Sequence, residues 1–188
     1  MRVPVYILAG GQSRRFGSDK ARAVLDGQPL VVRIAQSVQP VATQIRVVAA
    51  QAGAYEDLGL PTIADLHPGC GPIAGLEAAL ADCDQPWLAL LSCDLLQVHP
   101  HWIECLAAHR TDSAAAVAYR HRHWEPLIAL YHQRAQPVVR DRLAAGQLRM
   151  QALLDELETV AVDLPPDWPA QTQANTPADL DPIRKEQP

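Results

Sequence analysis

The sequence predicts an α/β fold in which a mostly parallel sheet carries helices on both faces, giving three layers. Short apolar runs alternate with segments of helical periodicity, and that alternation is typical of parallel sheets. Residues 3–9 and 87–93 are apolar almost throughout, as expected for strands that are buried on both faces. The length of 188 residues and the apolar fraction of 48% suit one folded domain with a core of this size.

The elements of the amino-terminal half follow from periodicity and from turn residues. Residues 3–9 predict a first strand that stops at paired glycines. Residues 25–30 predict a turn, and the apolar residues of 30–38 then recur at helical spacing. A glycine-rich loop at 69–75 leads into the next helix, because Pro72 suits an early helical position. Further strands are expected at 44–50, 62–64 and 87–93, and the second helix is expected to continue to residue 80.

The carboxyl-terminal half continues the alternation. A helix at 135–143 is expected to stop at Gly146. Several prolines gather after Leu164 and mark an irregular stretch. The other expected elements are strands at 113–119, 126–131 and 159–163 and helices at 100–110, 148–157 and 179–183.

Composition narrows the class of protein. The net charge of -5 argues against general binding of nucleic acid, which favours a basic face. No apolar stretch approaches the ~20 residues that a membrane span requires, and the first strand begins without a secretory pattern, so we expect a cytoplasmic protein. The four cysteines form no C-x-x-C pair and are interpreted as reduced thiols rather than as a zinc site.

The loop that follows the first strand has the composition of a phosphate-binding loop. Its glycines allow backbone N–H groups to approach a ligand, and successive N–H groups form a concavity that suits anions. Arg14, Arg15 and Lys20 add positive charge. A Walker A loop is excluded because Gly17 is not followed by Lys-Ser or Lys-Thr, and a dinucleotide fingerprint is excluded by Gln12. The alternative is a glycine-rich turn whose basic side chains are solvated.

Polar residues follow several of the predicted strands. Gly10 and Gly11, Asp65 and Asp94 each come directly after a strand, so in a parallel sheet they are expected to meet at one edge. A carboxylate there suits Mg²⁺, which prefers oxygen ligands and shares phosphates and waters. Asp94 is therefore the candidate metal ligand. The alternative interpretation is an aspartate that caps the following loop.

Residues Leu8 to Lys20 match every fixed position of the pattern L-A-G-G-x-S-x-R-x-G-x-D-K, and in this they resemble the molybdenum cofactor guanylyltransferases. A second match is Gly71-Pro72-Ile73-Ala74-Gly75, and a third is the N-T-P-x-D-L motif at residues 175–180. The resemblance spans nearly the whole chain. The first motif is highly specific, the second is moderately specific, and the third supports them.

This resemblance implies a fold, an activity and a cofactor. The fold would be a Rossmann-like, three-layer nucleotidyltransferase fold, as a single domain over residues 1–188. Residues 1–95 would form the GTP-binding half and residues 96–188 the pterin-acceptor half. The activity would be transfer of GMP from GTP to molybdopterin, which gives the guanine dinucleotide cofactor and pyrophosphate, with Mg²⁺ as cofactor. Proteins of molybdoenzyme maturation are further candidate partners, whereas nucleic acid and membranes are not expected as partners.

The resemblance also implies roles for individual residues. The catalytic residues would be Lys20, Arg15 and Asp94, with Asp94 also the metal ligand. Arg149 and Asn175 would lie on the pterin side, although a coincidental Arg149 and a plain helix start at Asn175 remain open. Asp65, as an acid, would suit the N1–H and 2-amino donors of guanine or a ribose hydroxyl, but it is also a turn-forming residue. The nucleotide-binding set would be Leu8, Ala9, Gly10, Gly11, Lys20, Asp65, Gly71 and Asp94.

Some residues depart from the family pattern and leave rivals open. Leu96 stands where the family commonly has proline, and the asparagines expected near Ala49 and at Gln173 are absent. One rival is a sibling transferase that uses CTP with the same pterin, or a sugar phosphate as acceptor; Gly10 favours guanine because related cytidylyltransferases typically have alanine there. Another rival is a nucleotide-binding module without catalysis. His99 and His101 lack a third ligand at helical spacing and are not expected to bind a metal.

Overall fold

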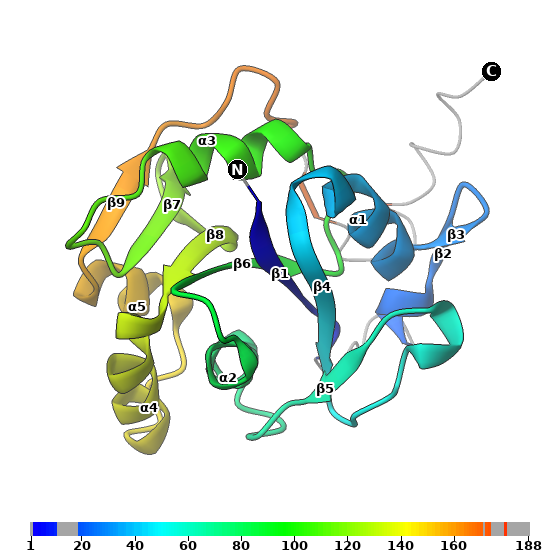
Figure 1. The fold of residues 1–188 in the computed structure, drawn as a ribbon, viewed down its shortest axis with the longest axis horizontal. Coiled ribbons are helices and arrows are strands. Elements are labelled where there is room, and N and C mark those ends of the chain that lie inside the picture. The colour runs from blue at the N-terminus through cyan, green and yellow to red at the C-terminus, as the bar shows by residue number, and fades with distance from the viewer. Residues whose placement is uncertain (1, 11–18, 171, 174–178, 180–188) are drawn as a thin grey trace.

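The computed structural model describes residues 2–10, 19–170, 172–173 and 179. At its centre is a seven-stranded sheet with the strand order β5-β4-β1-β6-β8-β7-β9 (Figure 1). The strands are β1 (Val3–Leu8), β4 (Ala42–Ala49), β5 (Thr62–Ala64), β6 (Trp87–Ser92), β7 (Ala116–Arg120), β8 (Trp124–His132) and β9 (Thr159–Val162). The α-helices are α1 (Leu30–Val38), α2 (Pro72–Asp82), α3 (Pro100–Ala108), α4 (Gln136–Ala144) and α5 (Met150–Glu156).

The side chains of β1 show how the three layers are held together. All six residues of this strand are buried. Val3, Val5 and Ile7 pack in one apolar cluster with residues of α1 and α3, whereas Tyr6 and Leu8 pack in a second cluster with residues of α2, α4 and α5. Figure 1 shows these two helix groups on opposite faces of the sheet. The predicted three-layer fold is therefore confirmed, because a central strand that alternates between two apolar layers needs helices on both sides.

The sheet is mostly parallel, as predicted, but β8 runs against both of its neighbours. β1 is parallel to β4 and β6, β4 to β5, and β7 to β9, whereas β8 pairs antiparallel with β6 and β7. Only residues 121–123 separate β7 from β8. A connection this short makes a hairpin, because a parallel crossover needs a dozen or more residues.

Several predicted boundaries were wrong. The strand expected from residue 113 begins at Ala116, and the strand expected at 126–131 is the longer β8. The turn expected at 25–30 lies in a small hairpin of β2 (Val24–Leu25) and β3 (Gln28–Pro29), whose turn residues Asp26 and Gly27 both have positive φ. The expected helix at 179–183 lies outside the described residues except for Asp179.

The strand order predicts where on the sheet a ligand would bind. The chain moves from β1 to β4 and β5 on one side and then returns to β6 on the other side of β1. In open α/β sheets, ligands bind outside the carboxyl ends of the strands at such a change of direction.

Of the helices in the described part of the chain, none has the length and apolar character that a membrane crossing requires.

Candidate active site

A cleft of about 670 Å³ lies at the carboxyl ends of the parallel strands. Leu8 and Gly10 of the first strand exit, Asp65 after β5 and Gly71 before α2 all line it. These four residues come from three of the predicted segments, and the family resemblance assigns all four to the nucleotide-binding set. Ala9 lies at the same strand exit, where its N–H donates to the carbonyl of Val48 (2.9 Å). The cleft therefore brings together Leu8, Gly10, Asp65 and Gly71 of the predicted nucleotide-binding set.

Close packing between α2 and β1 forms one wall of this cleft. A Cβ atom on Gly75 would lie 2.6 Å from Cδ2 of Leu8, closer than real Cβ contacts. The glycine therefore lets the helix approach the strand that carries the first loop. Gly71, at the amino-terminal cap of α2, has φ of +75°, which favours glycine. The fold thus explains the glycine at each end of the second motif: Gly71 adopts a positive φ, and Gly75 allows close packing against Leu8.

Asp65 has a turn-forming role as well as its place in the cleft. Its Oδ1 accepts a hydrogen bond from the N–H of His67 (2.9 Å), and its own N–H donates to the carbonyl of Ala49 (2.6 Å). One carboxylate oxygen thus fixes the turn toward Gly69. Both interpretations made from the sequence, the turn and the cleft-lining acid, are compatible with this geometry.

Lys20 and Asp94 meet beside the cleft although they are far apart in the sequence. The ammonium of Lys20 donates to Oδ2 of Asp94 at 2.8 Å, and both side chains are mostly shielded from solvent, with exposed fractions of 13% and 19%. The N–H of Cys93 donates to the carbonyl of Leu8 (3.0 Å), which holds the end of β6 against the end of β1. Lys20, at the end of the first motif, and Asp94 therefore lie together near the ends of β1 and β6.

The remaining oxygen of Asp94 fits a magnesium ligand. Oδ1 is buried and has no hydrogen-bond partner among the described residues. A buried carboxylate oxygen without a partner is costly unless a cation or water binds it. Mg²⁺ takes carboxylate oxygens, usually one or two, and completes its shell with phosphates and water. The residues present therefore fit Mg²⁺, with Asp94 as the protein ligand.

The loop after Asp94 is fixed by burial rather than by proline. Leu95 and Val98 are buried in the cluster that contains α1 and α3, and Leu96 packs with Leu25 and Leu30. The N–H of Leu96 also donates to the carbonyl of Thr172 (2.9 Å). Leucine in place of the family's proline thus leaves the path of this loop well determined.

The departure at Gln173 lies close to the acidic residue. Gln173 forms an antiparallel bridge with Leu95, the residue directly after Asp94. The carboxyl-terminal segment that leads to the N-T-P motif therefore runs beside the candidate active site. Asn175 itself lies outside the described residues.

A polar cluster that the sequence analysis missed anchors the end of the first loop. Asp19 caps the short 3-10 helix η1 (Lys20–Arg22) by accepting from the N–H of Ala21 (3.0 Å), and Tyr55 donates its hydroxyl to Asp19 (2.8 Å). Arg22 forms a bidentate pair with Asp57, at 2.8 Å for both contacts, and lies over the ring of Tyr55. The backbone that carries Lys20 is therefore held from two sides.

The signal for part of this cluster was in the sequence. Asp19 is a fixed position of the first motif and was given no role. Tyr55 lies just before the short helix η3 (Glu56–Leu58), in a stretch without apolar periodicity, so nothing in the sequence pointed to it. Burial is the main reason that the pKa of Tyr55 is raised, and its hydrogen bond to Asp19 adds to this effect. Tyr55 is thus a neutral donor at physiological pH.

Cys93 lies next to Asp94 but is not a candidate nucleophile. Burial, together with the nearby charge of Asp94, raises the pKa of its thiol to about 12. A thiol with such a pKa stays protonated near neutral pH and is unreactive. This agrees with the expectation that the cysteines are reduced thiols; all four are free.

Arg149 is not among the residues that line the cleft, and the remaining predicted site residues lie outside the described chain. Arg149 is exposed and is the cap residue of α5, whose Gln151 exchanges two hydrogen bonds with the backbone of Trp124 at the start of β8. Because β8 is antiparallel, that start faces the same sheet edge as the end of β6. Gly11 and Arg15 lie outside the described residues.

The chain resembles known proteins over most of its length. Residues 5–160 match the family model described as the MobA-like NTP transferase domain. A probable molybdenum cofactor guanylyltransferase from Deinococcus radiodurans is 39% identical over 83% of this chain and 81% of its own. A protein of the same description from Synechococcus elongatus is 33% identical over 95% of this chain and 96% of its own.

A solved structure of a protein with a related description has the same fold. Molybdopterin-guanine dinucleotide biosynthesis protein A from Archaeoglobus fulgidus is 26% identical, with a TM-score of 0.82 over 96% of each chain. This chain is therefore a member of the MobA-like NTP transferase family, which is a family of nucleotidyltransferases.

Proposed function

We propose that this chain transfers GMP from GTP to molybdopterin and releases pyrophosphate. The observation that carries the proposal is the 2.8 Å contact between Lys20 and Asp94 beside the cleft. In this proposal, a nucleoside binds between Gly10 and Gly71, and its triphosphate would extend to this cation and this carboxylate. The names of the Deinococcus and Synechococcus relatives support guanylyl transfer in particular.

The nucleoside would lie in the cleft and the phosphates would lie over the first loop. Small residues at Gly10, Ala50 and Gly71 leave room for a base or ribose to approach the backbone. Asp65 would accept hydrogen bonds from the N1–H and 2-amino groups of guanine or from a ribose hydroxyl. The positive charges of the first loop, including Arg15, would bind the phosphates because a guanidinium fork matches phosphate geometry.

The chemical step needs alignment and charge neutralisation more than it needs a base. A terminal phosphate oxygen of molybdopterin would attack the α-phosphorus of GTP, forming a P–O bond, while the bond to pyrophosphate breaks in line. The acceptor is already ionised, so no general base is required. Lys20 would neutralise charge on the departing pyrophosphate, and Asp94 would hold Mg²⁺. When bound, Mg²⁺ supplies further charge neutralisation on the phosphate oxygens.

The pterin acceptor would bind on the side of β8 and the carboxyl-terminal segment. Arg149 and Asn175 are the proposed contacts. The bridge between Leu95 and Gln173 supports this assignment, because it holds part of that segment beside Asp94. In this proposal, residues 1–95 bind GTP and residues 96–188 bind the acceptor. The four free cysteines suit the reducing cytoplasm, where we propose that the reaction takes place.

A turnover assay with two nucleotides tests this proposal. Purified protein, Mg²⁺ and molybdopterin are expected to release pyrophosphate from GTP and to form the guanine dinucleotide, with CTP much less effective. Faster turnover or tighter binding of CTP would instead indicate a cytidylyltransferase. GTP binding without pyrophosphate release on authentic pterin would indicate a binding module without catalysis.

A further inference from the structure

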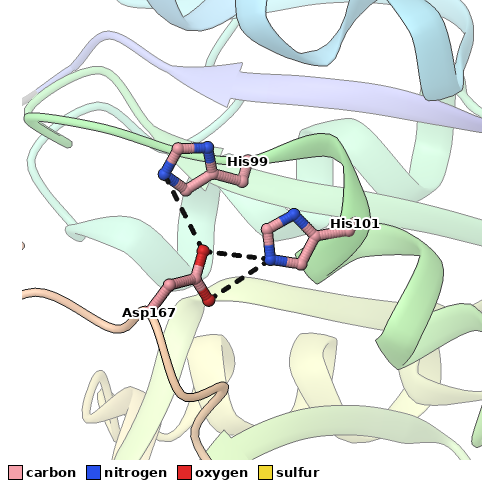
Figure 2. Close-up of side chains that lie close together, drawn as sticks. All are labelled: His99, His101 and Asp167. Atoms are coloured by element: carbon pink, nitrogen blue, oxygen red, sulfur yellow. Dashed lines mark hydrogen bonds and ion pairs between the residues drawn. The ribbon is translucent and has the colours of Figure 1, made fainter.

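Three potential metal ligands meet on the surface at the start of α3 (Figure 2). Nε2 of His101 is 3.1 Å from Oδ2 of Asp167, and Nε2 of His99 is 4.0 Å from the same oxygen. One ligand atom from each residue lies within 4.8 Å of the other two. The histidines were set aside in the sequence because a third ligand was sought at helical spacing. The third ligand comes from the segment after β9.

Buried neighbours orient these side chains. Nε1 of Trp102 donates to Oδ1 of Asp167 at 3.0 Å, and Trp102 is fully buried against the ring of Trp168. The His99 ring packs edge-on against Trp102, with 4.9 Å between centroids, and stacks on His101. Oδ1 of Asp167 also lies 3.2 Å from Nε2 of His101, so Trp102 and His101 together orient this carboxylate.

We propose that His99, His101 and Asp167 form a second metal site, for a borderline divalent transition ion of the class of Zn²⁺, Co²⁺ and Ni²⁺. Two imidazoles and one carboxylate suit such ions, whereas Mg²⁺ prefers oxygen ligands alone. Around a tetrahedral Zn²⁺ with bonds of about 2.0–2.2 Å, ligand atoms are roughly 3.3 Å apart. The separations of 3.1 and 4.0 Å approach that value.

Small rotamer changes would complete the site. The side chains of His99, His101 and Asp167 are 43%, 56% and 44% exposed, so they can adjust and water can fill the remaining position. Asp94, the proposed magnesium ligand, is not one of the three ligands of this second site. The second site is therefore separate from the magnesium site of the proposed reaction and does not depend on the proposed function.

The ion would join two segments that both run to the candidate active site. His99 ends the loop that starts at Asp94, and Asp167 lies on the segment that leads to Thr172 and Gln173. Those segments already pair through the N–H of Leu96 and the carbonyl of Thr172, at 2.9 Å, and through the Leu95–Gln173 bridge. A metal ion at the far end of the pair would restrict their separation, so the second part of the proposal is that this site stabilises the loop beside Asp94.

Binding is measured with Co²⁺ on tag-free protein in the absence of nucleotide. Co²⁺ absorbs visible light when bound by protein ligands, and it is expected to quench tryptophan fluorescence because Trp102 adjoins the site. Saturable binding is expected, and an excess of Mg²⁺ should not displace it. His101→Ala and Asp167→Asn should each weaken Co²⁺ binding at least about tenfold. Asparagine keeps an acceptor for Trp102, so the second variant tests the ligand without removing that hydrogen bond.

Matched variants on the same helix test the location. Sγ of Cys105 on α3 is 4.0 Å from Nδ1 of His109, the residue that caps the end of this helix, which makes this pair the rival ligand set. Cys105→Ser and His109→Ala should leave Co²⁺ affinity unchanged. The assignment is overturned if these variants abolish binding, if His101→Ala and Asp167→Asn bind as the wild type does, or if the wild type shows no saturable binding.

Hydrogen exchange tests the link to the loop. Zn²⁺ should slow exchange of the Leu96 amide in the wild type and leave it unchanged in Asp167→Asn. Unaltered exchange at saturating Zn²⁺ would refute the stabilising role, even where the Co²⁺ titration locates the site at His99, His101 and Asp167.

Discussion

Two neighbouring regions at the same sheet edge are constructed in different ways. The cleft around Gly10, Asp65 and Gly71 is shaped by backbone and small side chains, with Gly75 setting the distance between α2 and β1. The region around Lys20 and Asp94 depends on charged side chains, and Asp19 and Tyr55 anchor the backbone next to Lys20. The first region offers a shape, and the second offers charge.

This difference indicates a division of work. A backbone-lined cleft binds substrate and transition state about equally, and such uniform binding changes affinity more than rate. Charged groups aimed at the phosphates act where charge develops in the transition state and change the rate. Substitutions in the two regions should therefore separate into effects on nucleotide affinity and effects on turnover.

The largest effect is expected at Asp94. Asp94→Asn removes the carboxylate charge that would hold Mg²⁺, and we expect turnover to fall by at least about 10²–10³-fold. Nucleotide binding in the cleft should persist, and the circular dichroism spectrum should be unchanged. Mg²⁺-dependent pyrophosphate release measures the first effect, and equilibrium binding of GTP measures the second. Near-normal turnover would remove Asp94 from the mechanism.

A smaller effect on the opposite quantity is expected at Asp65. Asp65→Asn keeps an oxygen that can accept from the N–H of His67, so the turn should survive. Loss of the charge should weaken GTP binding by about 1.5–3 kcal/mol, or roughly 10–100-fold, with little change in turnover at saturation. Titration calorimetry with GTP and CTP checks this. Unchanged GTP affinity would leave Asp65 with the turn role alone.

The packing of the cleft wall can be tested with a pair of glycine variants. Gly75→Ala should lower the free energy of unfolding by about 1–3 kcal/mol, because its Cβ would meet Leu8 at 2.6 Å. Gly10→Ala is the matched control, since no atom of the residues that the structure describes lies within 4 Å of its added Cβ. Urea unfolding of both variants measures the difference. Equal stabilities would show that α2 moves away from β1 without cost.

The smallest effect is expected at Tyr55. Tyr55→Phe removes the hydrogen bond to Asp19 and should cost about 1 kcal/mol of stability at neutral pH, with a modest loss of turnover. Because the folded protein raises the pKa of Tyr55, its contribution is complete below the unfolded value of about 10 and is lost as pH rises above it. The free energy of unfolding, measured from pH 8 to pH 11, should therefore fall less steeply in the variant than in the wild type.

Another buried tyrosine gives the control for this change. The hydroxyl of Tyr131 donates to the carbonyl of Pro126, and burial raises the pKa of this tyrosine as well. Tyr131→Phe removes that hydrogen bond. It should reproduce the loss of stability without the loss of turnover. If both variants lowered turnover equally, the anchoring role of Tyr55 would be wrong.

Much of the fold could be predicted because burial leaves a signal in the sequence. Strand β1 and its paired glycines were found from an unbroken apolar run, and the strand-end rule brought Asp94 to the first loop. The direction of β8 could not be found in that way, because an apolar run predicts a buried strand without giving its direction. The short connection at residues 121–123 is the signal that would have shown it.

The parts of the site that were missed depend on contacts between distant irregular segments. Tyr55 supports Asp19 from a stretch that has no periodicity, and Asp167 joins His101 across 66 positions from a proline-rich segment. Neither pairing follows from spacing. Leu96 shows the same limitation in reverse, since its departure from the family pattern is compensated by packing against Leu25 and Leu30.

The most direct test is a crystal structure with Mg²⁺ and a GTP analogue that cannot be cleaved. We expect the guanine in the cleft beside Asp65 and Gly71, the phosphates within hydrogen-bond distance of Lys20, and Mg²⁺ on Asp94. A nucleotide bound elsewhere, or phosphates directed away from Lys20 and Asp94, would contradict this expectation.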